Sequence, residues 1–275
     1  ADLVIANFSP GVLGRLGLGI DHLRAANDRI VLVEMPAFSA ASNRAAHSGM
    51  GQTMEAASGM GSLMGYPDGP PQLTGSFYLD PVGGLHGAAA SLLGILRAVR
   101  AGQGASIEVG QVDAAVHWIG EYVLAVANGI RSLARSGNQV AGAAPHDAYP
   151  ALGEDEWLAI AVHDDRQWSA LCAAIGAPGL ALDPRLATEQ GRREHDALLR
   201  PAISRWSSGL SKTESAALLQ AAGVPAAPVH NGRDIAGDTA LAATGFFHEL
   251  DHPDAGRHVY PGLAHHLDRT PGGIE

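Results

Sequence analysis

The 275-residue chain lacks the features that mark several common classes of protein. It has one cysteine, Cys172, which excludes an internal disulfide framework and fits a reducing compartment. No 18-residue stretch is both apolar and uncharged, and no basic region followed by an apolar run opens the chain, so we expect neither a membrane span nor a signal peptide. Basic residues number 18 against 28 acidic ones, which argues against nucleic acid as a partner. We expect a cytoplasmic protein.

The sequence does contain an alternation of short apolar strands and helices. Residues 3–6 and 30–35 have the composition of buried strands, and residues 11–27 between them have helical spacing. A strand, a crossover helix and a second strand build a parallel sheet. Residues 106–109 are a further β-branched strand. With 46% hydrophobic residues the chain can bury a large core, and the pattern predicts an α/β fold of one or two domains.

Two domains are the more detailed prediction. Residues 1–135 hold the strand and helix alternation and include a long helix over 111–134. A mobile loop is expected over 135–150. Residues 145–230, with a strand at 157–162 followed by amphipathic helices, predict a smaller α+β domain. Residues 231–275 are expected to return to the first domain.

Asp80 lies where a predicted strand over 73–79 meets an apolar helix over 83–100. Asp followed by Pro is a common N-cap followed by the first helical residue, and that role needs no chemistry. A carboxylate in a cleft at a helix N-terminus can also be a base or a nucleophile, and as a nucleophile it would attack a thioester to give an acyl anhydride. Gly83, Gly84 and Gly87 would let a bulky ligand approach the backbone. The local pattern leaves both roles open.

Other reactive groups are less favoured by the sequence. Thirteen histidines occur, but none has the helical spacing with a carboxylate that a zinc hydrolase requires, so we expect no metal site. The Gly-x-Ser-x-Gly pattern of serine hydrolases is absent. Cys172 lies in an apolar helical stretch without a nearby base. Elimination therefore favours the carboxylate.

Residues 7–15 follow a predicted strand and enter a helix. Free backbone N–H groups and the helix dipole at such a position favour an anion, and Arg15 could add a charged fork. The alternative is a tight turn with a solvated arginine, and the segment alone does not decide between them.

Taken together, these segments resemble the family III CoA-transferases, which include formyl-CoA transferase, carnitine CoA-transferase and the bile-acid-inducible transferases. The matching segments follow the family order: residues 7–18, 58–71, Asp80 with its Gly-rich helix, 102–104 and 223–229. The resemblance implies a large Rossmann-like domain and a small domain, in two chains interlocked as a homodimer. The ligands would be an acyl-CoA and a carboxylic acid, with no tightly bound cofactor.

The same resemblance implies roles for individual residues. Asp80 would be the nucleophile, forming an acyl anhydride and then an aspartyl-CoA thioester. Coenzyme A contacts would come from two segments, namely Asn7, Phe8, Ser9 and Arg15, and Ser48, Gly49, Met50 and Gly51. A glycine loop that contains Gly137, Asn138 and Gly142 would cover the aspartate and exclude water.

Departures from the family pattern leave two alternatives. The related α-methylacyl-CoA racemases use a His and Asp pair, but the His position falls at Met50, three residues from His47, and a thioether cannot take a proton. A non-catalytic CoA-binding fragment is the second alternative. From the resemblance we expect the family's N-terminal strand and helix units and its C-terminal end to lie outside these 275 residues, and residues 39–44 replace a Gly-Gln-Thr-Gly-Pro motif.

Overall fold

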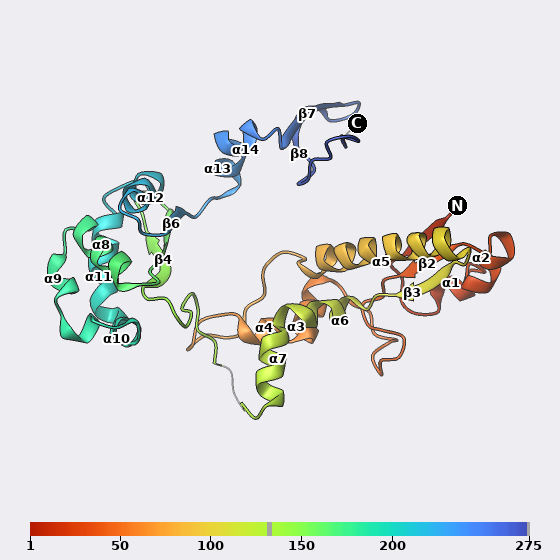
Figure 1. The fold of residues 1–275 in the computed structure, drawn as a ribbon, viewed down its shortest axis with the longest axis horizontal. Helices are drawn as coiled ribbons and strands as arrows, with labels where there is room; N and C mark the ends of the chain where they lie inside the picture. The colour runs from red at the N-terminus through yellow and green to blue at the C-terminus, as the bar shows by residue number, and fades with distance from the viewer. Residues whose placement is uncertain (131–133, 274–275) are drawn as a thin grey trace. The chain divides into compact units, whose positions relative to one another are not determined.

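A computed structural model describes residues 1–130 and 134–273 (Figure 1). The chain divides into two compact units, Ala1–Asn138 and Gln139–Glu275. Residues 231–275 belong to the second unit in this division, and their return to the large domain stays a prediction.

The first unit is built on a three-stranded parallel sheet. Its strands, in spatial order, are β1 (Leu3–Ala6), β2 (Val31–Glu34) and β3 (Ala105–Glu108). Val31, Leu32 and Val33 of the central strand are almost fully buried, as expected for a strand with neighbours on both sides. The predicted strands at 3–6, 30–35 and 106–109 are confirmed to within one residue at each end.

Helices connect these strands. The crossover from β1 to β2 contains α1 (Val12–Arg15) and α2 (Ile20–Ala26), and the connection from β2 to β3 contains α3 (Gly51–Ser58), α4 (Met60–Leu63) and α5 (Leu79–Ala101). After β3 come α6 (Gln111–Val116), the 3-10 turn η1 (His117–Ile119) and α7 (Gly120–Ala127). The predicted helix over 111–134 is therefore interrupted and ends early, and its residues 131–133 lie outside the described residues.

The predicted strand over 73–79 is wrong. These residues form turns and irregular backbone that end at α5. Gly75 has a φ of 77°, which a strand does not contain. The N–H of Thr74 donates to the carboxylate of Glu55 and not to a neighbouring strand. The apolar pattern gave no sign of either constraint.

A stripe of small residues brings α5 close to the sheet. Gly83, Gly87 and Gly94 are all buried on one side of the helix. A Cβ added at Gly94 would lie 2.5 Å from Cγ1 of Val31 in the central strand, and one added at Gly87 would collide with the thioether of Met35. The glycines thus allow the helix axis to approach the sheet.

The expectation that these glycines admit a bulky ligand needs correction. The missing side chains of Gly83 and Gly87 face Gln111 and Met35 of the chain itself. Only at Gly84, among the three glycines named for that purpose, is the Cβ position open, with no atom within 4 Å.

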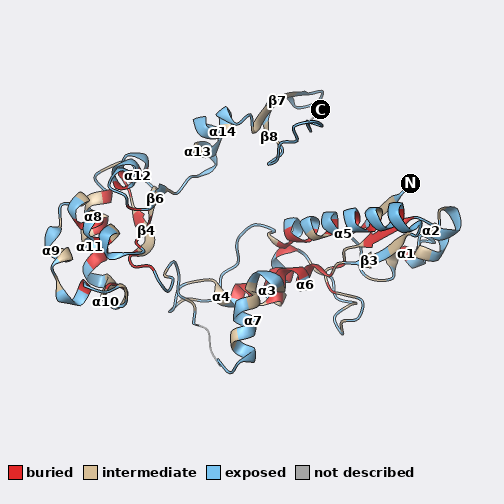
Figure 2. Cartoon of the chain, in the orientation of Figure 1, coloured by how far each residue is buried: buried red, intermediate tan, exposed pale blue. Residues whose placement is uncertain are grey.

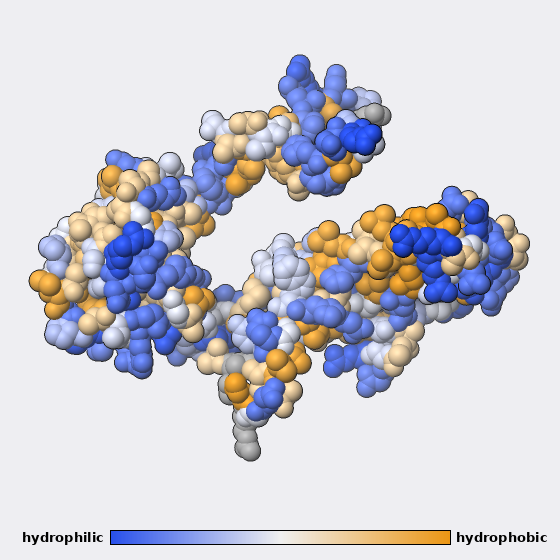
Figure 3. Space-filling model, viewed as in Figure 1, coloured by the Kyte–Doolittle hydropathy of each residue, from blue (hydrophilic) through white to orange (hydrophobic). Residues whose placement is uncertain are grey.

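The opposite face of α5 is apolar and exposed (Figures 2 and 3). It carries Leu85, Leu92, Leu93, Leu96 and Val99. By length and composition alone α5 could cross a membrane, and 33% of its most apolar stretch is buried. The core helix of a soluble protein can have the same length and composition, and α5 contacts β2 and β3.

The second unit contains a three-stranded antiparallel sheet in the order β4 (His146–Pro150), β5 (Trp157–Ala161) and β6 (Ala226–Pro228). Its helical elements are α8 (Asp165–Ala174), α9 (Pro178–Ala181), η2 (Pro184–Leu186), α10 (Glu189–Glu194), α11 (Asp196–Ser207) and α12 (Lys212–Ala221). The chain continues through α13 (Gly232–Ala236), α14 (Thr239–Ala243) and a hairpin of β7 (Phe247–His252) and β8 (Gly256–Pro261). The mixed composition is as predicted.

Strand β4 corrects the end of the loop predicted over 135–150, since residues 146–150 form a strand and residues 135–145 form neither helix nor strand. Tyr149 of β4 is fully buried and joins Leu158, Leu171, Leu199 and Leu219 in the core of this unit. Burial of the Tyr149 ring therefore anchors the end of the predicted loop in the core.

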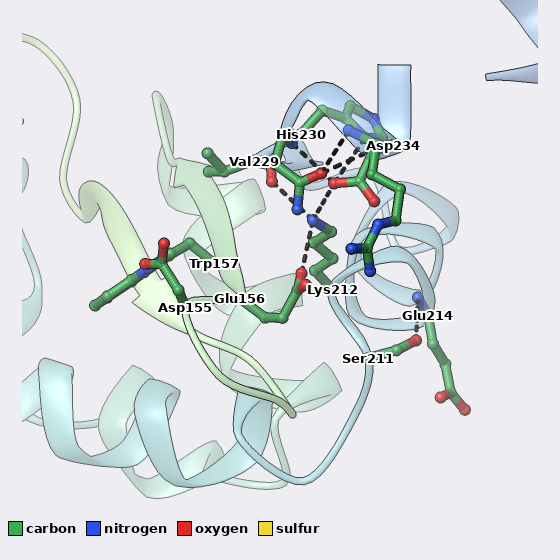
Figure 4. A network of polar contacts seen from close by, with 11 residues as sticks. Asp155, Glu156, Trp157, Ser211, Lys212, Glu214, Val229, His230 and Asp234 are labelled. Carbon is green, nitrogen blue, oxygen red and sulfur yellow. Dashed lines mark hydrogen bonds and ion pairs between the residues drawn. The ribbon is translucent and has the colours of Figure 1, made fainter. Parts of the chain in front are cut away.

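One buried ammonium group connects distant parts of the second unit (Figure 4). Lys212, at the start of α12, is 7% exposed. Its Nζ forms ion pairs with Glu156, at 2.6 Å, and with Asp234, and donates to the carbonyl oxygen of Val229 at 3.0 Å. The carboxylate of Asp234 also accepts the N–H of Asn231 at 2.8 Å. Lys212 thus ties the beginning of α13 to the residue that precedes β5.

Packing at the glycine stripe predicts opposite effects for two Gly→Ala changes on α5. Gly94→Ala should lower the free energy of unfolding by about 1–3 kcal/mol, because the new methyl group meets the stiff side chain of Val31. Gly84→Ala is the matched control and should be neutral or stabilising by up to about 1 kcal/mol. Urea denaturation measures both variants. Equal effects would contradict the close approach of α5 to β2.

The Lys212 network predicts an acid-sensitive contribution to stability. The hydrogen bond from Lys212 lowers the pKa of the Asp234 carboxyl, so the contribution is complete above the unfolded pKa of about 3.9 and is lost as the pH falls through the folded value. The hydrogen bond to Asp234 raises the pKa of Lys212, so the alkaline loss begins only above about pH 10.4.

Thermal unfolding of the wild type and Asp234→Asn should show a difference in melting temperature that is constant down to about pH 4 and closes below it. Asp268→Asn, which changes an exposed carboxylate, serves as the control and should show no pH-dependent difference. A difference for Asp234→Asn that persists unchanged at about pH 2 would contradict the role of this ion pair.

Candidate active site

A cavity of about 340 Å³ lies in the first unit, beside the carboxyl ends of its parallel strands. Its lining residues are Asn7, Phe8, Ser9, Val12, Ala37, Ser48, Gly49, Met54, Asp80 and Gln111. Asn7 comes directly after β1, Ala37 soon after β2 and Gln111 soon after β3. Ligands of open α/β sheets bind at this edge, and the volume suits a small-molecule site.

Six of the residues predicted from the sequence meet at this cavity: Asp80, Asn7, Phe8, Ser9, Ser48 and Gly49. The other three predicted coenzyme A contacts do not line it. Arg15 is exposed on α1, Met50 is 70% exposed, and Gly51 is buried against the ring of Phe77. Helix α1 has only four residues, so its dipole is smaller than that of a long helix, and the anion site at its N-terminus stays a prediction. Contact with coenzyme A stays a prediction for all eight residues.

The predicted glycine loop crosses the boundary between the two units. The N–H of Gly137 donates to the carbonyl oxygen of Gly65 at 3.0 Å, and its Cα lies beside the ring of Tyr66. Asn138 ends the first unit, and Gly142, with a φ of 86°, belongs to the second. That the loop covers Asp80 stays a prediction.

Asp80 is the second residue of α5 and not its N-cap, which corrects the capping interpretation. Its N–H donates to the carbonyl oxygen of Phe77 at 3.0 Å, and Tyr78 already has helical dihedral angles. Leu79 is fully buried with Met54 in a hydrophobic cluster, and the helix starts at Leu79, two residues earlier than the Asp-Pro pair predicts. In the first turn of a long helix, the dipole and free N–H groups still stabilise the carboxylate.

The segment that leads to Asp80 is fixed to α3 at two points. Glu55 is fully buried, and its carboxylate accepts the N–H and the hydroxyl of Thr74, each at 2.8 Å. The ring of Phe77 fills the space over Gly51, where a Cβ would collide with it. Sequence reasoning missed Glu55, since a single acidic residue in a helical stretch belongs to no motif.

Gln111 is the second residue that sequence reasoning missed. It is 5% exposed, and its Nε2 donates to Oδ1 of Asn7 and to the carbonyl oxygen of Met35, both at 2.8 Å. A Cβ at Gly83 would lie 2.9 Å from its Cγ, so the side chain rests on α5 one turn after Asp80. Its position could have identified Gln111, because it is a polar residue just after the strand predicted over 106–109. Residues 7–15 follow a predicted strand in the same way.

Asp80 is the one ionisable residue among the cavity lining in the described part of the chain. Neither His47 nor Met50 lines the cavity, so none of the described lining residues is a base opposite Asp80. Cys172 is fully buried in the core of the second unit, and burial raises the pKa of its thiol to about 11, which makes it a poor nucleophile. No group of three or more metal-ligating side chains occurs within residues 1–130 and 134–273.

Comparison with known proteins shows which family the chain resembles. The model of CoA-transferase family III matches residues 1–275. The succinyl-CoA–D-citramalate CoA-transferase of Chloroflexus aurantiacus is 30% identical over 100% of this chain and 68% of its own length. The acetyl-CoA:oxalate CoA-transferase of Acetobacter aceti is 31% identical over 83% of this chain and 59% of its own.

A solved structure is also similar. The crystal structure of a CAIB/BAIF family protein from Brucella suis aligns with a TM-score of 0.88 at 25% identity, over 98% of this chain and 70% of that one. The 275 residues thus span only part of each of these three proteins. The family match covers the whole chain, and the chain belongs to CoA-transferase family III.

Proposed function

We propose that the protein transfers coenzyme A from an acyl-CoA to a carboxylic acid, with Asp80 as the nucleophile. The observation that carries the proposal is the position of Asp80, the one ionisable residue among the described residues lining the cavity at the strand ends. Membership of the family supports the reaction class. Polar groups of Asn7, Ser9 and Ser48 share the cavity and are available to bind the thioester.

The reaction begins when a carboxylate oxygen of Asp80 attacks the thioester carbonyl. The carbon–sulfur bond breaks, coenzyme A leaves as the thiolate, and Asp80 carries a mixed acyl anhydride. The thiolate then attacks the aspartyl carbonyl, which releases the first acid as its carboxylate and leaves an aspartyl-CoA thioester. The acceptor carboxylate repeats these steps in reverse, which forms the new acyl-CoA and regenerates Asp80.

The proposed acceptor is a dicarboxylic acid. Citramalate and oxalate appear in the names of the two related transferases, and each of these acids carries two carboxylates. An anhydride hydrolyses readily in water, so the intermediate requires a covered site, and the glycine loop with Gly137 and Gly142 is the proposed cover. The full-length protein is proposed to act in the cytoplasm as a homodimer, and the exposed apolar face of α5 supports association with another surface.

Replacement of Asp80 tests the proposal in the full-length protein. Asp80→Asn and Asp80→Ala should reduce coenzyme A exchange between succinyl-CoA and citramalate or oxalate by at least about 10³-fold, because the nucleophile is lost. Binding of coenzyme A should persist. Asp21→Asn is the matched control, since Asp21 is also an exposed second residue of a helix, and exchange should be unchanged.

Hydroxylamine trapping gives the direct measurement. Incubation with succinyl-CoA and hydroxylamine should convert Asp80 alone to a hydroxamate, detected by mass spectrometry of its peptide. Normal exchange by Asp80→Ala would refute the nucleophile. Exchange of the α-proton of an acyl-CoA without transfer of coenzyme A would instead indicate a racemase.

A further inference from the structure

The orientation of the Gln111 amide follows from its partners. The carbonyl oxygen of Met35 can only accept a hydrogen bond, so the atom of Gln111 that faces it must be the nitrogen Nε2. Nε2 has two protons, and the second is directed to the side chain of Asn7 at 2.8 Å. The atom of Asn7 that receives this proton must be its oxygen, Oδ1. A backbone carbonyl therefore determines the orientation of two successive side-chain amides.

The consequence appears on the cavity side of Asn7. With Oδ1 facing Gln111, Nδ2 and its two N–H groups are directed away from Gln111, and Asn7 is an exposed member of the cavity lining. We infer that Gln111 is a positioning residue that sets the polarity of Asn7, so that Nδ2 of Asn7 donates a hydrogen bond to an oxygen of the CoA thioester. The identity of this ligand rests on the proposed function.

Gln111 is itself held firmly. It begins α6, where its N–H donates to the carbonyl oxygen of Pro36 at 3.0 Å. Its Cγ packs over Gly83, and its side chain is nearly buried. An amide confined in this way keeps one orientation, so Asn7 is preorganised before ligand binds and less entropy is lost on binding.

The acceptor oxygen has two chemical sources within the ligand. One is the thioester carbonyl, which an acyl-CoA has and free coenzyme A lacks. The other is an amide, hydroxyl or phosphate oxygen of the coenzyme A part, which both ligands share. Binding of free coenzyme A and of acetyl-CoA therefore distinguishes the two sources.

Isosteric variants change the polarity without changing the shape. Asn7→Asp keeps an acceptor for Gln111 but presents an oxygen to the ligand, and Gln111→Glu removes the donor that orients Asn7. Each should weaken binding of acetyl-CoA to the full-length protein about tenfold or more in calorimetric titration. The matched controls are Asn128→Asp and Gln103→Glu, exposed amides of the same unit outside the cavity, which should bind as the wild type does.

A double-mutant cycle separates the relay from a general structural effect. Because Gln111 acts through Asn7, Asn7→Ala with Gln111→Leu should bind acetyl-CoA no more weakly than Asn7→Ala alone. Thermal unfolding confirms that each variant is folded. Additive losses would show that Gln111 acts independently and would overturn the inference, as would wild-type affinity in Asn7→Asp.

Failure of this inference can be distinguished from failure of the proposed function. If the wild type and the variants bind coenzyme A as expected but the wild type transfers none, the proposed transfer reaction is refuted and the orientation of Asn7 by Gln111 is still supported. A loss for acetyl-CoA alone assigns the oxygen to the thioester carbonyl, and a loss for both ligands assigns it to coenzyme A. If the wild type binds neither ligand in the titration, the inference is refuted.

Discussion

The close approach of α5 to the central strand β2 is the contact on which the site depends. Gly87 and Gly94 lack the side chains that would meet Met35 and Val31 and hold the helix away from the sheet, and Gly83 leaves room for Gln111 of α6. The same approach brings the first turn of α5, with Asp80, beside the residues that follow the strands. A larger side chain at these positions would move the helix or its neighbours. The position of the Asp80 carboxylate therefore depends on the packing of these small residues.

Two hydrogen-bonded side chains also position the site, one at the backbone before α5 and the other at the ends of the strands. The buried carboxylate of Glu55 holds the backbone before α5 through Thr74, and so fixes where the helix begins. The buried amide of Gln111 joins the ends of the strands through Met35 and Asn7, and so fixes which atoms face the cavity. Hydrogen bonds made by buried groups are costly to break, which makes both connections rigid.

The sequence predicted the parts of the fold that depend on local composition. The strands of the parallel sheet were found because short β-branched runs are bounded by turns, whereas Asp80, Asn7 and Ser9 were named as site residues through the resemblance to family III CoA-transferases. Gln111 bonds to residues 104 and 76 positions away, and no local pattern contains that information. The irregular segment at 73–79 was mistaken for a strand for the same reason, since its backbone partner is a side chain of α3.

Met35 contacts both α5 and Gln111, which restricts the substitutions that related sequences can accept at this position. Its carbonyl oxygen receives the Gln111 amide, while its thioether fills the space that Gly87 leaves open. Substitutions at these two positions are therefore coupled: a residue larger than glycine at 87 requires a smaller one at 35. Covariation between these positions would accordingly report contact between α5 and the sheet, while the backbone carbonyl, which no substitution removes, would allow the orientation of Asn7 to persist.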